Sequence, residues 1–402
     1  MPWKEIDPMT EKERFVHLAR SGRFTITQLC EEFSISRKTG HKYLMRFEQE
    51  GRDGLLERSR RPKCSTTATD EAIEALILTL RRKHPTWGPK KIHVLLWRDY
   101  GIKNPPHLNT IGLILRRHGL VKKRKRKAGK YEVCRDHLTE PTRPNEVWTV
   151  DFKGWFTLGN GHRCDPLTVC DRFSRYVIAC KAQPNQQYNR TFYSFKKIMR
   201  HYGLPEIIRV DNGTPFAASF SPGRLSQLSV WWVMQGIQVE FIRPSSPQEN
   251  GSHERMHKDL KAEAIKPAAP TFRAQQKRFD RWRQQYNQVR PHEALDMLCP
   301  ADIYRSSSRR LGEQDKLSYP SDYIVKRVAE SGHISYKGTT FYVGQSYYQA
   351  LVALYENEQG VTELHFANLH LGNLEYHPNE RWNGKPTIIS PNEVPRQPAP
   401  SK

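Results

Sequence analysis

The stretch 147–152, with the sequence VWTVDF, predicts a buried β-strand that ends in a carboxylate. The stretch 205–213, PEIIRVDNG, repeats this arrangement, since an apolar strand is followed by Asp211 and a turn. A helix predicted farther along the chain carries a third acidic residue, Glu254. If both strands belong to one mixed sheet, Asp151, Asp211 and Glu254 meet at one of its edges.

Three carboxylates at one sheet edge would hold one or two Mg²⁺ ions, with open positions for water and phosphate oxygens. Two such ions can clamp the attacking and leaving oxygens of an in-line phosphoryl displacement. Each carboxylate taken alone is more often an ordinary residue at a strand end or a helix N-terminus. The ordered set therefore carries the prediction, which is a phosphoryl-transfer site with Asp151, Asp211 and Glu254 as catalytic, metal-binding residues.

The surrounding segments predict an α/β domain over residues 145–310. Residues 167–181 indicate a hairpin, 189–202 and 226–235 indicate helices, and 239–242 indicate a short strand. Strands that alternate with helices in this way are typical of a sheet covered by helices. The three carboxylates would then belong to one folding unit.

Three blocks of this domain resemble those of the DDE integrase core: VWTVDF (147–152), RVDNGTPF (209–216) and SPQENGSHERMHKDLK (246–261). Bacterial insertion-sequence transposases and retroviral integrases share that core, which has an RNase H-like fold. Residues 282–295 resemble the end of the core in the transposases, and the chain is similar to them over roughly residues 10–310.

The resemblance implies both the chemistry and the DNA contacts of the site. It implies that the three carboxylates bind two Mg²⁺ or Mn²⁺ ions. The chain would hydrolyse phosphodiesters at terminal inverted repeats and join the freed 3′-OH ends to target DNA. Lys258 and Lys261, on one face of the Glu254 helix, and more weakly Asn250 would contact DNA. We expect a homo-oligomer on double-stranded DNA, without membrane contact, in the nucleoid region of the bacterial cytoplasm.

One departure from the family lies between the second and third carboxylates. The 43 positions from Asp211 to Glu254 are more than is usual in the family. We expect the surplus in residues 217–228, before the next helix. The assignment of Glu254 does not depend on this length, because the residues around it still match the third block.

Residues 253–257, HERMH, also form an H-E-x-x-H motif, the zinc signature of metalloproteases. No further ligand context follows, the flanking sequence is basic, and a protease gives no role to Asp151 or Asp211. The motif is therefore interpreted as a coincidence of a short pattern. A second alternative, from another class, is a DNA-binding regulator whose integrase core is catalytically inactive.

Residues 1–62 predict a first helix-turn-helix unit. Thr10 and Thr25 are expected to cap its first two helices and Ser36 its third, in which Gly40 costs about 1 kcal/mol relative to Ala. Basic and hydroxyl residues early in the third helix suit docking into the DNA major groove. These candidate DNA-binding residues are Arg37, Lys38, Thr39 and Lys42.

Residues 63–120 predict a second unit of the same kind, in which Asn109 caps the third helix. A basic linker follows over residues 121–144. Its candidate phosphate contacts are Lys122, Lys123, Arg124, Lys125 and Arg126. The 402 residues carry a net charge of +23, most of it in residues 1–144, which indicates a polyanionic partner such as double-stranded DNA.

Residues 318–377 predict a small all-β, barrel-like module, and residues 378–402 predict a disordered Pro-rich tail. The fold class is thus multidomain, with all-α helix-turn-helix units, a central α/β RNase H-like integrase core and a C-terminal all-β module. No apolar stretch approaches the ~20 residues of a membrane span, and the N-terminus lacks the apolar region of a signal peptide. Seven cysteines without a C-x-x-C pair favour a reducing compartment.

Overall fold

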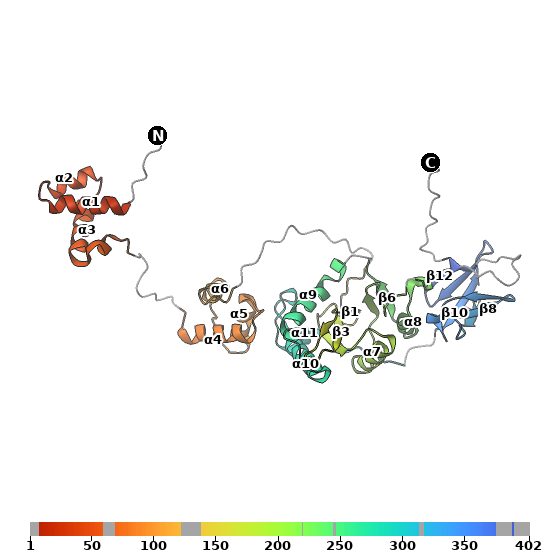
Figure 1. The fold of residues 1–402 in the computed structure, drawn as a ribbon. Helices are drawn as coiled ribbons and strands as arrows, with labels where there is room; N and C mark the ends of the chain where they lie inside the picture. Colours follow the sequence, from red (N-terminus) through yellow and green to blue (C-terminus); the bar gives the residue numbers. More distant parts are fainter. Residues whose placement is uncertain are drawn as a thin grey trace, which may run out of the picture. The chain divides into compact units, whose positions relative to one another are not determined.

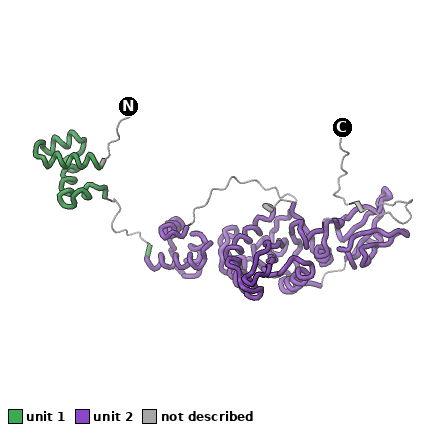
Figure 2. The backbone as a smooth tube through the Cα atoms, viewed as in Figure 1, with its two compact units in different colours: residues 1–70 green, residues 71–402 purple. Residues whose placement is uncertain are grey.

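The computed structural model describes residues 8–58, 69–121, 138–218, 220–243, 247–312, 317–374 and 388–389. Figure 1 shows the order of the elements along the chain. The chain divides into two compact units, residues 1–70 and residues 71–402 (Figure 2). The described residues contain no helix long and apolar enough to cross a membrane.

The first unit is a helical bundle. Its elements are α1 (Pro8–Arg20), α2 (Ile26–Glu32), α3 (Arg37–Glu50) and the 3₁₀ turn η1 (Gly51–Leu55). The side chains of Thr25 and Ser36 cap α2 and α3, as the sequence predicts. The expected cap at Thr10 is wrong, because the helix is already formed at Pro8. Phe15 is buried at the centre of the bundle, which confirms an N-terminal helical region.

A second helical bundle opens the second unit. Its helices are α4 (Glu71–Lys83), α5 (Pro89–Arg98) and α6 (Leu108–Arg117). The predicted cap of α6 is wrong by two positions. The ring of His107 accepts a hydrogen bond from the backbone N–H of Asn109, so His107 is the capping residue. Apolar residues of all three helices, together with Trp87, form one core.

A mixed sheet forms the centre of the second unit. Its strands are β1 (Val147–Phe152), β2 (Phe156–Thr157), β3 (Arg163–Asp171), β4 (Val177–Gln183), β5 (Ile207–Val210) and β6 (Gln238–Phe241). Their order is β2-β3-β1-β5-β6, and β4 also pairs with β3. β3 is antiparallel to β1 and β4, which confirms the predicted hairpin. β5 is parallel to β1 and β6.

Helices cover both faces of this sheet (Figure 1). They are α7 (Tyr188–Tyr202), α8 (Gln227–Met234), α9 (Gly251–Leu260), α10 (Phe272–Gln288) and α11 (Pro300–Ile303), with short turns η2 (Pro222–Arg224), η3 (Pro247–Asn250), η4 (Lys261–Ile265) and η5 (Glu293–Leu295). On one face Trp148 packs with Phe195 of α7 and Trp232 of α8. On the other, Cys170 packs with residues of α9 and α10, including Phe279. The predicted α/β core is confirmed.

The C-terminal part is antiparallel β-structure. Its elements are β7 (Ile324–Arg327), β8 (His333–Tyr336), β9 (Thr339–Tyr342), η6 (Gln345–Tyr347), β10 (Leu351–Glu356), β11 (Thr362–Phe366), β12 (Leu369–Leu374) and β13 (Ile388–Ile389). One sheet has the order β13-β12-β11-β10-β7, and β8 and β9 form a separate hairpin. Lys337 and Gly338, with φ of +46° and +78°, form the two-residue turn of that hairpin. β13 lies within the tail that we expected to be disordered, and the rest of 378–402 lies outside the described residues.

Residues 217–228, where we expected the extra length, contact the C-terminal sheet. The hydroxyl of Tyr347 donates to the backbone oxygen of Pro222 at 2.6 Å. The hydroxyls of Ser221 and Ser346 lie 2.8 Å apart. This segment therefore connects the central sheet of the second unit to its C-terminal module.

Candidate active site

The topology of the sheet places the two predicted aspartates on neighbouring strands. Asp151 lies on β1, opposite Thr168 of β3. Asp211 comes directly after Val210, the last residue of β5, and β5 is parallel to β1. Parallel neighbours end at the same edge of a sheet, so both carboxylates lie at one edge. Glu254 is in the first turn of α9, which packs on the same sheet.

The three carboxylates interact electrostatically. Burial, followed by the negative charge of Asp211, raises the pKa of Asp151 to about 7, and Glu254 adds to this effect. The backbone N–H of Phe152 and the charge of Lys153 act in the opposite direction. The side chain of Asp151 keeps 28% of its surface exposed, so its carboxyl is open to a ligand. Carboxylates that repel one another in this way are a donor set suited to a divalent cation.

The turn after β5 orients Asp211. The backbone N–H of Gly213 donates to Oδ1 of Asp211 at 3.1 Å. A Cβ atom at Gly213 would lie 3.3 Å from the other carboxylate oxygen, so this position favours glycine. The side-chain amide of Asn212 donates to the backbone oxygen of Ile242 at 2.6 Å and holds the turn against the chain beyond β6.

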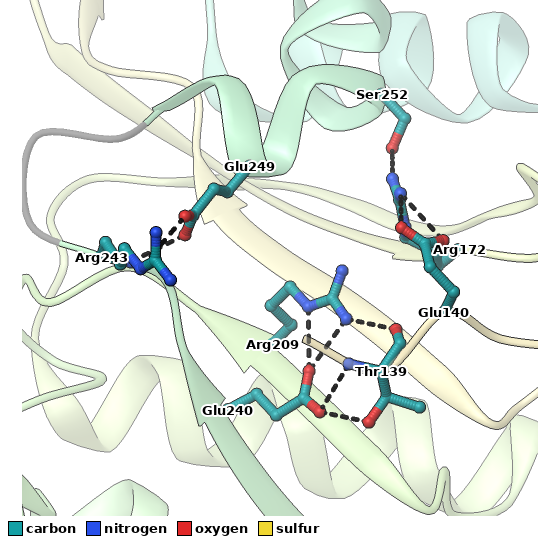
Figure 3. Close-up of polar contacts among 8 residues, drawn as sticks. All are labelled: Thr139, Glu140, Arg172, Arg209, Glu240, Arg243, Glu249 and Ser252. Atoms are coloured by element: carbon teal, nitrogen blue, oxygen red, sulfur yellow. Dashed lines mark hydrogen bonds and ion pairs between the residues drawn. The ribbon is translucent and has the colours of Figure 1, made fainter. Parts of the chain in front are cut away.

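A buried ion pair fixes the strand that precedes Asp211 (Figure 3). The guanidinium of Arg209 on β5 is fully buried, and its Nη2 lies 2.9 Å from Oε2 of Glu240 on β6. The same Nη2 donates to the backbone oxygen of Thr139 at 2.5 Å, and the N–H of Thr139 donates to Glu240 at 3.1 Å. Because Asp211 comes two positions after Arg209, this network sets the position of the second carboxylate.

A second group of polar contacts fixes the start of α9, the helix that carries the third carboxylate (Figure 3). The buried side chain of Glu249 accepts a hydrogen bond of 2.8 Å from the backbone N–H of Arg243. Arg172 donates to the hydroxyl of Ser252 at 2.7 Å and to Glu140 at 3.0 Å. The ends of α9 and β5 are thus both held by charged groups that lie outside the three carboxylates.

The two histidines of the H-E-x-x-H motif are buried against the sheet. Oγ1 of Thr168 lies 2.7 Å from Nε2 of His253 and 2.7 Å from Nε2 of His257. Oγ1 of Thr149 lies 2.8 Å from Nδ1 of His253, and Nδ1 of His257 lies 3.6 Å from Oδ2 of Asp151. Burial lowers the pKa of His253 to about 3 and also lowers the pKa of His257, so both rings are neutral near pH 7.

This geometry differs from that of a metalloprotease, in which both histidines of the motif bind one zinc ion. Here threonine hydroxyls contact both ring nitrogens of His253. The sequence pattern alone indicated no role for the two histidines beyond a coincidental motif. The available signal was the polar alternation of Thr149 and Asp151 within an otherwise apolar strand, which indicates polar contacts on the face that α9 covers.

The candidate DNA contacts of the first unit lie at the start of α3. Arg37, Lys38 and Lys42 are exposed, and Nζ of Lys42 lies 4.6 Å from the ring centroid of Tyr43. Thr39 is half-buried, and its hydroxyl lies 2.9 Å from that of the capping residue at the start of the helix. The basic side chains are therefore accessible to DNA, whereas the hydroxyl of Thr39 already has a hydrogen-bond partner within the helix.

The candidate DNA contacts near Glu254 differ in accessibility. Lys258 and Lys261 are exposed, and Lys261 begins the π-helical turn η4. Asn250 is 6% exposed, and its buried Oδ1 has no hydrogen-bond partner among the described residues. The linker candidates lie outside the described residues: Lys122, Lys123, Arg124, Lys125 and Arg126.

Family models match most of this architecture. Two integrase core domain models match residues 141–247 and 235–300. A helix-turn-helix domain model matches residues 11–63, and a homeodomain-like domain model matches residues 39–115. The chain therefore combines helix-turn-helix domains with an integrase core.

Its relatives include proteins of bacterial insertion elements. An uncharacterized 31.7 kDa protein of insertion element IS407 from Burkholderia multivorans is 26% identical over 58% of this chain and 81% of its own length. A protein of insertion element IS136 from Agrobacterium fabrum is 27% identical over 49% of this chain and 97% of its own length. The catalytic core domain of HTLV-2 integrase aligns with 41% of this chain over its whole length, with 16% identity and a TM-score of 0.33. The resemblance to insertion-sequence transposases and retroviral integrases is confirmed.

Proposed function

We propose that this chain is a DDE transposase. It binds the terminal inverted repeats of its element, hydrolyses phosphodiesters to free 3′-OH ends and joins these ends to target DNA. The observation that carries the proposal is the placement of Asp151 and Asp211 at one edge of an integrase-type sheet, with Glu254 on the covering helix near enough for its charge to help raise the pKa of Asp151. The helix-turn-helix domains before the core support DNA as the substrate.

The three carboxylates would hold two divalent cations, Mg²⁺ or Mn²⁺. The raised pKa of Asp151 supports this, because the neighbouring negative charges that raise it are the charges that a cation would neutralise. When bound, the ions supply Lewis acidity to the oxygens of the scissile phosphodiester. The chain fixes the ligands through the buried contacts of Arg209 and Glu249.

The exposed lysines of α9 and η4 would bind the backbone of the cleaved DNA end. Lys258 and Lys261 follow Glu254 on the same helical segment and are free to reach phosphates. The basic side chains of α3 would read the element ends in the major groove. Joining two ends requires two active sites, so we propose a homo-oligomer assembled on DNA in the bacterial cytoplasm.

Strand transfer on labelled DNA that carries the flanking repeats of the chain's own locus tests the proposal. Asp151→Asn, Asp211→Asn and Glu254→Gln should each lower cleavage and joining by more than about 10²-fold, because even groups that only orient a metal ligand are worth 10- to 100-fold. Activity should require Mg²⁺ or Mn²⁺, and Zn²⁺ alone should not support it.

The control is Asp280→Asn, which changes an exposed carboxylate on α10 and should leave the activity intact. All three site variants should still bind end DNA in gel shifts. Full activity in one of them would remove that residue from the site. A wild-type chain that binds its ends but cuts nothing with either ion would instead be the inactive regulator.

A further inference from the structure

The hydroxyl of Thr168 determines where the protons lie in the buried cluster beside Asp151. Among the described residues, its Oγ1 has three hydrogen-bonding neighbours: the backbone oxygen of Asp151 at 2.9 Å and the Nε2 atoms of His253 and His257, each at 2.7 Å. A carbonyl oxygen can only accept, so Thr168 donates its one proton to Asp151. The two lone pairs of Oγ1 then accept from the two rings. Both histidines therefore carry a proton on Nε2.

This arrangement uses both nitrogens of His253. With Nε2 protonated, Nδ1 of its neutral ring is an acceptor, and the hydroxyl of Thr149 lies 2.8 Å away as the donor. The other acceptor near Thr149, the backbone oxygen of Cys170, is more distant at 3.4 Å. His253, Thr149 and Thr168 thus satisfy one another, and His253 has no nitrogen left for another partner.

His257 is different, because its second nitrogen faces a carboxylate. With Nε2 protonated, Nδ1 of the neutral ring presents a lone pair, and Oδ2 of Asp151 lies 3.6 Å from it. That separation is too long for a hydrogen bond. Two lone pairs that face each other repel unless a cation lies between them. Nitrogen and oxygen ligands of one ion, each about 2.0–2.2 Å from it, are separated by roughly 3–3.5 Å, which is close to the distance observed.

We propose that Nδ1 of His257 is a metal ligand beside Asp151 and that this nitrogen shifts the preference of the site from Mg²⁺ toward Mn²⁺. The inference rests on the metal site of the proposed function. Glu254 and His257 lie three positions apart on α9 and therefore share one side of the helix. The donor atoms of Asp151, His253 and His257 lie within 4.8 Å of one another. Imidazole is a good ligand for transition metals, whereas Mg²⁺ prefers oxygen.

The test uses the full-length chain, stripped with EDTA and loaded with less than one equivalent of Mn²⁺. Electron spin echo modulation of the bound Mn²⁺ should show a directly coordinated nitrogen. His257→Gln should remove that signal and weaken Mn²⁺ binding about 10- to 100-fold. The affinity for Mg²⁺, measured by competition, should change less than about 3-fold, because oxygen ligands supply most of its binding energy.

His253→Gln is the matched control, since it lies on the same helix, is equally buried and contacts the same Thr168. It should keep the nitrogen signal. Mn²⁺ bound to the wild type through oxygen alone overturns the inference, even if neither variant folds. A nitrogen signal that survives His257→Gln, or one lost equally in His253→Gln, also overturns it.

The experiments distinguish a failure of the role of His257 from a failure of the proposed function. If the wild type cleaves DNA with Mn²⁺ but binds the ion through oxygen only, the role of His257 fails and the transposase proposal stands. If Asp151→Asn cleaves at the wild-type rate, Asp151 is not a metal ligand, so the assignment of Asp151 and the role of His257 beside it both fail. A wild-type chain that binds no Mn²⁺ also contradicts both.

Discussion

At the scale of single residues, Asp151 is where stability and the proposed chemistry conflict. Its carboxyl is partly buried beside two other acids, and both this burial and the two negative charges disfavour its ionised form. A fold selected only for stability would place a neutral residue at this position. Strongly perturbed titratable groups in an accessible position are typical of functional sites, where the cost of the charge is offset when a ligand binds.

We predict a pH-dependent gain in stability for Asp151→Asn. Burial and Asp211 raise the pKa of Asp151 in the folded state to about 7. Below the ordinary pKa of an aspartate, Asp151 is neutral in both the folded and the unfolded chain and costs no stability. As the pH rises from there through 7, ionisation favours the unfolded chain, so the free energy of unfolding falls. The variant removes this loss, so it should melt at a higher temperature than the wild type in EDTA, with a larger gain at pH 8 than at pH 5.

The raised pKa bounds the size of this effect. Raising the pKa of Asp151 from its ordinary value to about 7 corresponds to at most about 4 kcal/mol at pH 8, before relaxation of the site reduces it. Thermal unfolding in EDTA at both pH values measures the gain, with the exposed Asp280→Asn as the control. Added Mn²⁺ should stabilise the wild type more than the variant. Equal gains at pH 5 and pH 8 would contradict the assignment of the charge to Asp151.

At the scale of elements, the sequence predicts the strands and helices that depend on local patterns of apolar residues. The strand at 147–152 and the hairpin at 167–181 follow from runs of apolar residues, and both are observed. The helix start at Asn109 was wrong because His107, which is not a typical capping residue, supplies the acceptor. The buried rings of His253 and His257 contact threonine hydroxyls of β1 and β3. The residue pattern of α9 alone cannot predict contacts with other strands.

Gly40 shows how packing can reverse the effect of a residue on the stability of a helical bundle. From the sequence, this glycine only weakens α3. In the bundle, a Cβ atom at Gly40 would lie 2.7 Å from Sγ of Cys30 and 2.9 Å from Cζ of Phe15, both buried. The glycine therefore allows α3 to approach α1 and α2 closely. Gly112 of α6 is the contrasting case, because the nearest atom of the described residues to a Cβ there would be Cγ of Pro89, at 3.7 Å.

We predict that alanine stabilises the protein at Gly112 but not at Gly40. Gly112→Ala should stabilise its bundle by about 0.5–1 kcal/mol, the difference in helix propensity. Gly40→Ala gains the same propensity but must displace two buried side chains, at a cost of about 1–3 kcal/mol, so it should be neutral to destabilising by about 2 kcal/mol. Chemical denaturation of the two variants, followed by circular dichroism, gives both signs. Stabilisation by Gly40→Ala would mean that the bundle is looser than the structure shows.

At the scale of the whole molecule, the proposed recognition and the proposed chemistry fall in different parts of the chain. The three carboxylates belong to the second unit, whereas the exposed basic residues of α3 belong to the first. The sequence placed two aspartates at strand ends, and the structure brings these ends to one edge because β1 and β5 are parallel. The catalytic role of the three carboxylates stays a prediction. The DNA contacts stay a prediction, because basic residues on a helix surface look the same whether they meet phosphate or water.

If α3 contacts bases and the linker contacts phosphates, variants of the two segments should change DNA binding in different ways. Arg37→Ala and Lys42→Ala alter exposed residues on α3 and should reduce the preference for element ends over scrambled DNA. Changing the linker residues to Gln should instead weaken binding to all DNAs alike, because phosphate contacts carry no sequence information. The linker residues to change together are Lys122, Lys123, Arg124, Lys125 and Arg126.

The salt dependence of binding distinguishes these two classes. Each phosphate contact contributes about 0.9 to the slope of log affinity against log salt, so losing five contacts should flatten that slope by at most about 4.5. The α3 variants should leave the slope nearly unchanged, since they alter contacts with bases. Gel shifts of the full chain on end and scrambled DNA, over about 50–200 mM salt, measure both quantities. If the linker variant changes the ratio of the two affinities instead of the slope, the linker reads sequence. If the wild type shows no preference for its own ends, recognition does not lie in the helix-turn-helix units.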